Sequence, residues 1–416
     1  MMETDVHVLD KSSFLNYSIK DANTFIVSVI TITMLAGFPI QVISGTKIHY
    51  AAFILGCFIL LLINMVAVIN YLKLVYFSVF ALPILYFLSS SGIDNAFIFS
   101  LVPYVIVPIV FWNKAFVAFK LESVLKIFQF FTAIYFIGVL LQMVGVSAPF
   151  LAMDITKTEG IVHERYGSFA GGTLALGLTA SVSFIFTYYE WVYEKRKGIV
   201  PLLLLLISFF TLLFAQSRRF YILIFAVALL IYIYNRPARP GSLKKVLSYA
   251  TIALVLLILI VLYFFKDSNY YLQRIFSVAD FAEDESNLLR VAKWLQAIQA
   301  FLRHFWFGMG LGASGTIGKN FDPMVTSVDD ILVAESYYLK ILLECGVVFG
   351  SGYLMFQVFL LTKIFRSFRM PGVAFPAFLL VFFFLESFMS TSLESALPSM
   401  LFWISVSKLL MQDTQM

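Results

Sequence analysis

Stretches of about 20 predominantly apolar residues recur along this chain, from Thr24 almost to its C-terminus. Helices of that length cross the hydrocarbon core of a bilayer, whereas the backbone groups of open strands would find no hydrogen-bond partners in lipid. The composition agrees, because 13% of the residues are charged, whereas a soluble domain carries about 25%. The sequence therefore excludes a soluble protein and predicts an all-α polytopic membrane protein.

We predict about twelve transmembrane helices. They are expected near residues 24–44, 48–69, 72–90, 95–113, 124–147, 168–190, 199–216, 219–235, 246–265, 334–362, 372–390 and 395–411. The first nine lie within 24–265 and the last three within 334–411, so residues 266–333 form one large loop between them. Residues 1–23 and 412–416 are the terminal segments.

The basic residues fall mainly in alternate connectors, on one side of the membrane. That side receives Lys11, Lys20, Lys73, Lys114, Lys120, Lys126, Lys195, Arg196, Lys197, Arg236, Arg239, Lys244, Lys245, Lys363, Arg366, Arg369 and Lys408. By the positive-inside rule it is the cytoplasm, so both termini are predicted to be cytoplasmic and the large loop extracytoplasmic. The net charge of +5 is thus a topology signal, and we expect no nucleic-acid partner.

Neither the cysteines nor the acidic residues predict a metal site or a cofactor. Cys57 and Cys345 both lie within apolar segments, which indicates neither a disulfide framework nor metal ligands. The cluster 283–285, or Asp329 and Asp330, has the hard oxygen ligands that a divalent cation prefers. Acidic runs of this kind are usually solvated, so we expect no metal.

The large loop contains a pattern that predicts an amphipathic helix. Its apolar face holds Val291, Trp294, Leu295, Ile298, Phe301, Leu302 and Phe305, and its polar face holds Arg290, Lys293, Gln296, Gln299 and Arg303. Such a helix lies on the outer membrane surface or roofs the bundle; the alternative is a packing helix with a solvated polar face. The glycines of the following FGMGLGASG indicate a tight turn, since no strand precedes them as in a dinucleotide-binding motif.

Four arginines are predicted on the outer side, against the positive-inside bias: Arg165, Arg218, Arg219 and Arg290. A guanidinium group binds phosphate oxygens through two parallel hydrogen bonds, so these residues are candidates for binding a pyrophosphate-linked lipid. The alternative for Arg218 and Arg219 is an interfacial anchor at the end of a span.

Glu335 is predicted at the outer start of a span, with Glu344 deeper in the same span. A partly desolvated carboxylate can serve as a general base. The alternative is that Glu335 pairs with a nearby arginine and only fixes the geometry of the loop.

Four ordered segments resemble the superfamily of O-antigen polymerases and O-antigen ligases. They are RYGSFAGG, AQSRRFYILIFAVALLIYIY, LLRVAKWLQAIQAFLRHFWFGMGLG and ESYYLKILLECGVVFGSGYL, within roughly residues 160–362. The resemblance implies a glycosyltransferase bundle of the GT-C type in the bacterial inner membrane, with its active site facing the periplasm. Arg165, Arg218 and Arg290 match the arginines of the family's motifs.

The resemblance favours the polymerase branch. Glu335 and Ser336 stand where the ligase branch often has a His-Asn pair. The implied reaction transfers a growing glycan from undecaprenyl pyrophosphate to a lipid-linked repeat unit, with Glu335 and Arg290 as catalytic residues and with a flippase and a chain-length regulator as partners. The rival hypotheses are a ligase that transfers glycan to lipid A core, and a transporter or flippase for lipid-linked oligosaccharide. A transporter usually keeps its charged groups near the midplane and shows repeated halves.

Overall fold

A computed structural model describes residues 11–64, 100–117, 119–158, 161–196, 198–234, 285–314, 335–370 and 372–411, with isolated positions between 73 and 84. The described elements are α1 (Lys11–Leu35), α2 (Gly37–Ser44), α3 (Ile48–Ile63), η1 (Val102–Ile106), α6 (Val107–Phe111), η2 (Lys114–Phe116), α7 (Leu121–Met143), β1 (Ala152–Thr158), β2 (Ile161–Ser168), α8 (Thr173–Val192), α9 (Ile199–Ala215), α10 (Arg218–Tyr234), α13 (Glu285–Arg303), α15 (Tyr337–Ser367), α16 (Ala374–Met389), η5 (Ser392–Glu394) and α17 (Ala396–Met411).

The described part of the chain is a bundle of apolar helices, as predicted. In this part α7 and α15 are each long and apolar enough to cross a membrane, and α1 with α2 forms a third candidate if this pair, bent by 63°, is one span. The helices α3, α9, α10, α16 and α17, and η1 with α6, are apolar but shorter. The count of about twelve spans stays a prediction, because 246–265 and most of 72–90 lie outside the described residues.

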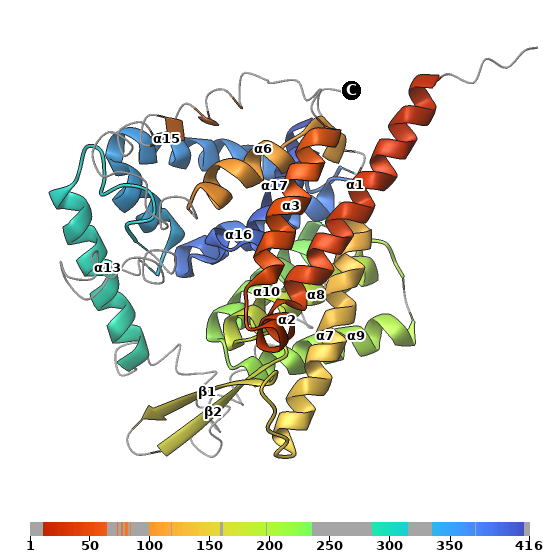
Figure 1. The fold of residues 1–416 in the computed structure, drawn as a ribbon, viewed down its shortest axis with the longest axis vertical. Coiled ribbons are helices and arrows are strands. Elements are labelled where there is room, and N and C mark those ends of the chain that lie inside the picture. The colour runs from red at the N-terminus through yellow and green to blue at the C-terminus, as the bar shows by residue number, and fades with distance from the viewer. Residues whose placement is uncertain are drawn as a thin grey trace, which may run out of the picture.

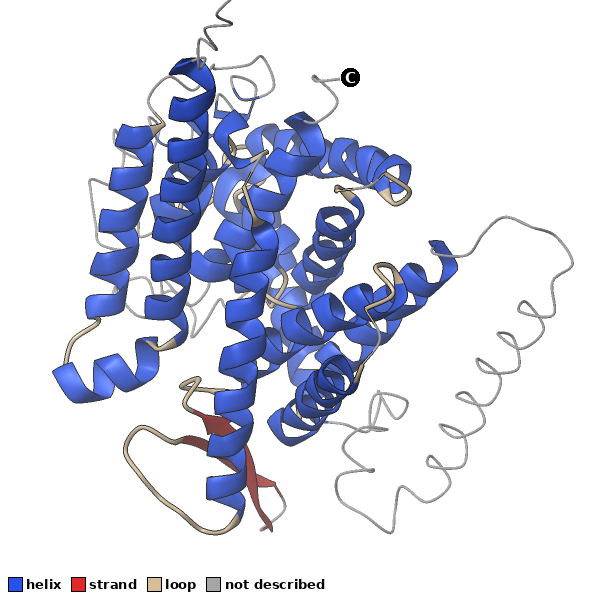
Figure 2. Ribbon diagram, turned by 90° about the vertical axis from the view of Figure 1, so that its right-hand side faces the viewer, coloured by secondary structure: helices blue, strands red, loops and turns tan. Residues whose placement is uncertain are grey.

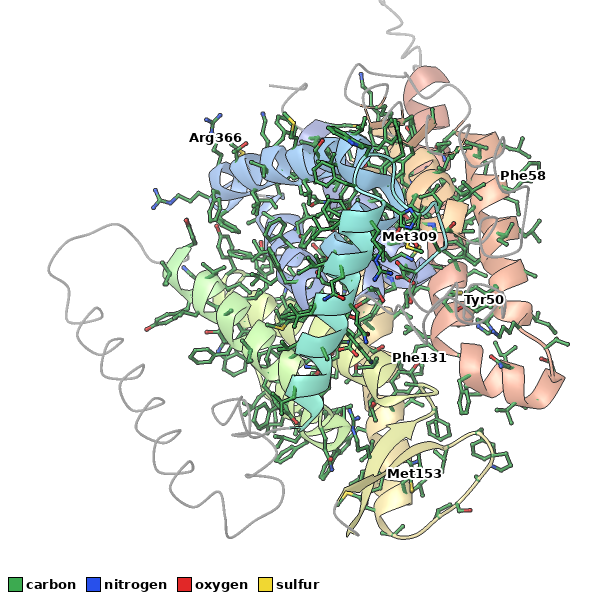
Figure 3. All side chains as sticks on the ribbon, turned by 90° about the vertical axis from the view of Figure 1, so that its left-hand side faces the viewer. Tyr50, Phe58, Phe131, Met153, Met309 and Arg366 are labelled. Atoms are coloured by element: carbon green, nitrogen blue, oxygen red, sulfur yellow. The ribbon has the colours of Figure 1, made fainter. Side chains whose placement is uncertain are left out.

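The outer surfaces of α1 and α3 carry apolar stripes, consistent with contact with lipid. The two helices lie side by side at one edge of the bundle (Figure 1). Their exposed apolar residues repeat at helical spacing: Phe25, Val29 and Ile32 on α1, and Leu55, Phe58 and Leu62 on α3. Figure 3 shows Phe58 pointing away from the bundle. An apolar patch that continues over two helices marks a surface made for lipid or protein rather than water.

The core is formed where α16 packs against α10, α15 and α17. These helices bring many aromatic rings together. Trp112 and Trp403 stack with their ring centroids 5.4 Å apart, and Phe356 stacks on Trp403 at 5.8 Å. Such offset ring pairs bury large apolar areas and fix the helices relative to one another.

A β-hairpin occupies the connection that we predicted as a loop between the spans 124–147 and 168–190. Its strands β1 and β2 pair antiparallel, with Asp154 opposite Arg165, and lie at one end of the bundle (Figure 2). The end of β2 is attached to α7, because Gln142 accepts a hydrogen bond from the Ser168 backbone N–H and the Ser168 hydroxyl donates to the Tyr135 carbonyl. The next helix, α8, consequently begins at Thr173 rather than near residue 168.

Candidate active site

The start of α15 is joined to α13 by a carboxylate held between two cations. Glu335 lies directly before α15 and pairs with Arg290 (Nε to Oε2, 3.0 Å) and with Lys293 (Nζ to Oε1, 2.8 Å). Arg290 and Lys293 are three residues apart, so they share one face of α13. Both carboxylate oxygens are therefore occupied. The pairing of Glu335 with a nearby arginine, one of its two predicted roles, is present.

The helix α13 does not turn its predicted apolar face toward the bundle. The predicted polar residues Arg290 and Lys293 face α15, and Ala297 is buried on the same side. Much of the predicted apolar face is exposed instead, at Leu295, Ile298 and Leu302, and Leu288 extends this stripe. Figure 1 shows α13 standing at the edge of the helical bundle. One side of α13 thus carries charge to the site, and another presents an apolar stripe.

Arg219 is the most buried of the described outer arginines. Its side chain is 8% exposed at the start of α10, where Nη1 donates to the Met389 carbonyl at 3.2 Å. That carbonyl belongs to the last residue of α16, so the guanidinium occupies the negative end of that helix. Nη2 lies 3.8 Å from the buried carboxylate of Glu386, which also accepts a hydrogen bond from the Ser392 hydroxyl. The Nε of Arg219 and the Oε2 of Glu386 are buried without a hydrogen bond in the described part of the chain.

Three of the predicted arginines, Arg165, Arg219 and Arg290, interact electrostatically. The charges of Arg290, Arg165 and Glu335 act on the Arg219 guanidinium, together with that of Glu386. These residues belong to α13, β2, the position directly before α15, and α16, so charges from four separate segments act on the start of α10. The side chain of Arg218 lies outside the described part of the structure, and its role stays a prediction.

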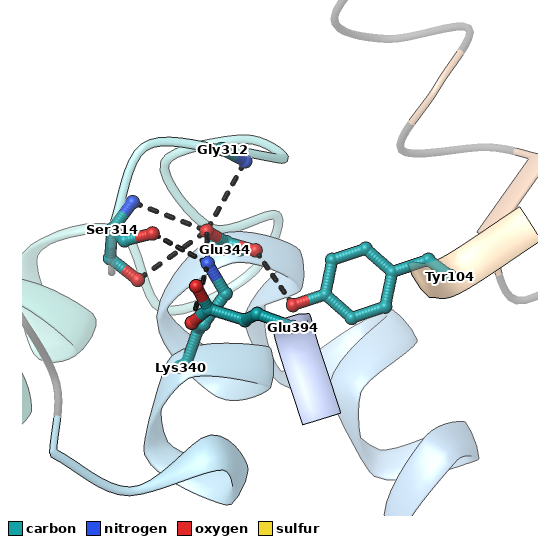
Figure 4. A network of polar contacts seen from close by, with 6 residues as sticks. All are labelled: Tyr104, Gly312, Ser314, Lys340, Glu344 and Glu394. Carbon is teal, nitrogen blue, oxygen red and sulfur yellow. Dashed lines mark hydrogen bonds and ion pairs between the residues drawn. The ribbon is translucent and has the colours of Figure 1, made fainter. Parts of the chain in front are cut away.

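A second polar network lies deeper in the same bundle (Figure 4), and Glu344 is its one member that the sequence analysis singled out. Lys340 Nζ lies 2.7 Å from Glu344 and 3.2 Å from Glu394, and all three side chains are buried. The hydroxyl of Tyr104 donates to the other oxygen of Glu344 at 3.2 Å. The available signal was a lysine and a glutamate four residues apart inside an apolar span, where ionisable residues are rare and usually paired.

The glycine-rich segment after α13 inserts into a break in α15. Gly346 has φ 65° and interrupts the helix that we predicted as one continuous span over 334–362. Backbone groups of residues 305–310 replace the missing helical hydrogen bonds: Met309 N–H donates to Leu343 and Gly310 N–H to Glu344, while Val347 and Val348 donate to Phe305 and Trp306. Figure 3 marks Met309 beside α13. The glycines do allow tight turns, as predicted, since Gly308, Gly310 and Gly312 all have positive φ.

No group of three or more His, Cys, Asp or Glu side chains is arranged to hold a metal ion within the described ranges. The acidic residues Asp329, Asp330, Glu283 and Asp284 lie outside those ranges. The described site holds guanidinium and ammonium groups beside carboxylates, which suits a polyanionic substrate.

The comparisons with known proteins point in the same direction. Residues 203–356 match the family model described as O-antigen ligase. The matched segment contains Arg219, Arg290, Glu335 and the Lys340–Glu344 pair, whereas Arg165, Glu386 and Glu394 lie outside it. No curated protein matches the chain. The family match supports a role in the assembly of surface polysaccharide and shows that this segment is similar to the O-antigen ligases.

Proposed function

We propose that this protein is a surface polysaccharide polymerase of the O-antigen type. It transfers a growing glycan from undecaprenyl pyrophosphate to a lipid-linked repeat unit, with inversion at the anomeric carbon, on the periplasmic face of the bacterial inner membrane. The observation that carries the proposal is the pairing of Arg290 and Lys293 with Glu335. The charges of Arg165 and Arg290 also act on the buried guanidinium of Arg219. Three guanidinium groups on one side of a membrane protein suit a pyrophosphate attached to a lipid.

The arginines stabilise the charge that develops on the leaving group. A hydroxyl oxygen of the acceptor sugar attacks the anomeric carbon of the donor, the bond from that carbon to the pyrophosphate oxygen breaks, and its electron pair leaves with the pyrophosphate. Positive groups already fixed where that charge appears lower the barrier without having to reorganise. Arg219 is suited to this role because it is held between Met389 and Glu386, and its buried Nε has no hydrogen-bond partner among the described residues.

Glu335 accepts the proton of the attacking hydroxyl. In the absence of substrate its two oxygens are bound by Arg290 and Lys293. A pyrophosphate carries more negative charge than one carboxylate and competes for the same cations. Binding of the donor thus draws Arg290 and Lys293 away from Glu335 and frees the carboxylate to act as a base, so the base becomes available only when the donor is present.

Gene deletion with complementation tests the proposal. The host gene is deleted and replaced by wild type, Arg290→Ala or Glu335→Gln, and the surface glycan is resolved by gel after the level of each protein has been checked. For a polymerase, the deletion leaves glycan with a single repeat unit, and both variants fail to restore the ladder. If Glu335→Gln restores a full ladder, the base lies elsewhere.

A ligase is the second candidate, because the matching family is described as O-antigen ligase. The residues at the start of α15 favour the polymerase, since Glu335 and Ser336 stand where the ligase branch often has a His-Asn pair. The same deletion separates the two. Long lipid-linked chains that accumulate without reaching the acceptor indicate a ligase, and single units retained on the cytoplasmic leaflet indicate a flippase.

A further inference from the structure

The helix α13 is attached to α15 at two places. Near the start of α13, Arg290 and Lys293 pair with Glu335. Beyond its end, the segment 305–314 is bound to the broken part of α15 by backbone hydrogen bonds and by the Glu344 carboxylate. We call this segment the glycine loop. A helix held at both ends has a fixed direction, so the two attachments together determine where its side chains point.

The first attachment, the pairing with Glu335, opens when the donor binds. In the reaction proposed above, the donor pyrophosphate draws Arg290 and Lys293 away from Glu335, and the ion pairs that hold the start of α13 are broken. The second attachment contains none of the groups that would meet the donor or the acceptor. It therefore persists through the reaction and becomes the main restraint on the position of α13.

Glu344 is the centre of this second attachment. One of its carboxylate oxygens accepts hydrogen bonds from the backbone N–H groups of Gly312 and Ser314, each at 3.2 Å, and from the Ser314 hydroxyl at 3.4 Å. Lys340 Nζ lies 2.7 Å from the same oxygen and donates to the Ser314 carbonyl at 2.5 Å. The carboxylate and the ammonium group thus hold both the donors and the acceptor of one turn of the glycine loop (Figure 4).

Packing alone does not account for the buried ion pair of Lys340 and Glu344 in α15. The side chains of Lys340 and Glu344 are completely buried within a candidate membrane span. Burying an ion pair is costly, and apolar side chains of the same volume often stabilise a core at least as well. The backbone groups of the glycine loop do account for the carboxylate, because buried N–H groups without an acceptor are themselves costly.

The glycine loop and α15 pack backbone against backbone at Gly308 and Gly346. A Cβ atom added to Gly308 would lie 2.4 Å from the Glu344 carbonyl oxygen, and one added to Gly346 would lie 2.4 Å from that of Trp306. The two backbones therefore touch directly. Any displacement of the glycine loop is transmitted to α13, because His304 continues the hydrogen bonding of that helix up to the loop.

We propose that Glu344, oriented by Lys340, is a positioning residue that holds the glycine loop in the break of α15 and thereby keeps Arg290 in place when its pairing with Glu335 opens. The first part of this role, the holding of the loop, is independent of the reaction. The second part rests on the proposed function.

The test compares Glu344→Gln with two matched controls. Glu344→Gln keeps the shape of the side chain, removes the negative charge that pairs with Lys340, and weakens the hydrogen bonds from the glycine loop. Tyr104→Phe removes another hydrogen bond to the same carboxylate and leaves the contacts to the glycine loop. Glu190→Gln removes a carboxylate that pairs with Arg196 at 2.8 Å, away from the loop. Glu344→Asp, which retains the charge, serves as a milder variant if Glu344→Gln does not fold.

Two measurements on protein purified in lipid nanodiscs decide the outcome. Hydrogen exchange reports on the glycine loop, and transfer of lipid-linked repeat units isolated from the deletion strain reports on the reaction. Glu344→Gln is expected to exchange the loop amides about tenfold faster and to reduce transfer by about tenfold to a hundredfold. Both controls leave the loop exchange unchanged. In an Arg290→Ala background the Glu344→Gln loss largely disappears, because the two residues act through one interaction.

Unchanged exchange of the glycine loop in Glu344→Gln overturns the holding role. Faster exchange with undiminished transfer, or losses that simply add to those of Arg290→Ala, overturn the positioning of Arg290. A wild-type protein that transfers no repeat units, while Glu344→Gln still loosens the loop, contradicts the proposed function and supports the holding role.

Discussion

Arg219 shows how a single buried residue can serve both the fold and the site. Its side chain ties the start of α10 to the end of α16 through Met389 and Glu386. The same guanidinium keeps a buried Nε without a hydrogen bond in the described residues. An arginine whose N–H groups were all hydrogen-bonded would only stabilise the fold, whereas the Nε–H of Arg219 can still donate to an anion. Lysine has no planar group that can reach the two neighbours and a phosphate together.

We predict that Glu386→Gln restores the stability of Arg219→Ala but not its activity. Removing Arg219 leaves Glu386 buried without its cation, which costs about 3 kcal/mol or more. Arg219→Ala with Glu386→Gln removes the uncompensated charge and recovers most of that loss, as measured by the thermal midpoint in detergent. The ladder of surface glycan stays absent in both. Equal midpoints for the single and double variants would show that the pair is not coupled.

The sequence singled out several charged residues of the candidate site but not all of their partners. Arg165, Arg219, Arg290 and Glu335 were proposed as site residues because they are predicted on the outer side of the membrane, and their roles stay predictions. Glu386 and Glu394 were not proposed, because each lies near the end of an apolar segment. Glu386 meets Arg219 only where α16 packs against α10, and Glu394 meets Lys340 only because of the turn after α16. Such contacts are fixed by the packing of distant helices and have no local signature.

Among the elements, the break in α15 is the feature that depends most on backbone geometry. Gly308 and Gly346 both have positive φ, and each would place a Cβ against the other segment. Gly45 also has positive φ, 67°, but nothing lies within 4 Å of a Cβ added there. Comparing a substitution at Gly45 with one at Gly308 or Gly346 therefore separates the free-energy cost of a positive φ from the cost of a steric clash.

We predict that Gly346→Ala and Gly308→Ala prevent accumulation of folded protein, while Gly45→Ala is tolerated. The conformational cost alone is about 1 kcal/mol, and at Gly45 it is the whole effect. At the other two positions the close contact adds overpacking of about 1–3 kcal/mol or more. Size-exclusion profiles and thermal midpoints of the three variants measure this order. A Gly346→Ala protein as stable as Gly45→Ala would mean that the loop does not fill the break.

The exposed apolar stripe of α13 also leads to a prediction. Leu295 and Leu302 are exposed on this helix, whereas Gln296 and Gln299 are exposed on its polar side. A helix with such a division lies in the membrane interface with its apolar side buried in the acyl boundary. Fluorophores attached to cysteines at 295 and 302 are expected to be quenched by lipid-bound nitroxides, and those at 296 and 299 by aqueous iodide. Quenching by iodide at all four positions would place α13 in water.

Elements with a clear apolar period were predicted well, and the remainder were not. The spans near 124–147, 199–216 and 395–411 correspond closely to α7, α9 and α17. The hairpin β1–β2 was missed because its residues are mostly polar and the strands pair with each other at one end of the bundle rather than in a core. The break at Gly346 was missed because a single glycine is common in membrane helices.

For the whole molecule, the predicted topology places the β-hairpin and the arginines on one side of the membrane and the connector after α8 on the other. Cys57 and Cys345 are both buried, so the background labelling of native thiols is low. We expect a membrane-impermeant maleimide to label Val146→Cys in intact spheroplasts and Lys195→Cys only after the membrane is opened. Both positions are exposed in the structure. Labelling of Lys195→Cys in intact spheroplasts would reverse the predicted orientation.

The break in α15 also bears on how the chain is inserted during synthesis. A new span that enters lipid before its neighbours must satisfy its own backbone groups, since no water is available there. In the finished protein, residues 305–310 supply four backbone hydrogen bonds around Gly346. These residues are translated before α15 and are separated from it in the sequence by residues 315–334. We therefore expect α15 to enter the bilayer as a continuous helix and to open at Gly346 only as the glycine loop docks, so that late maturation of the chain, rather than its insertion, completes the active site.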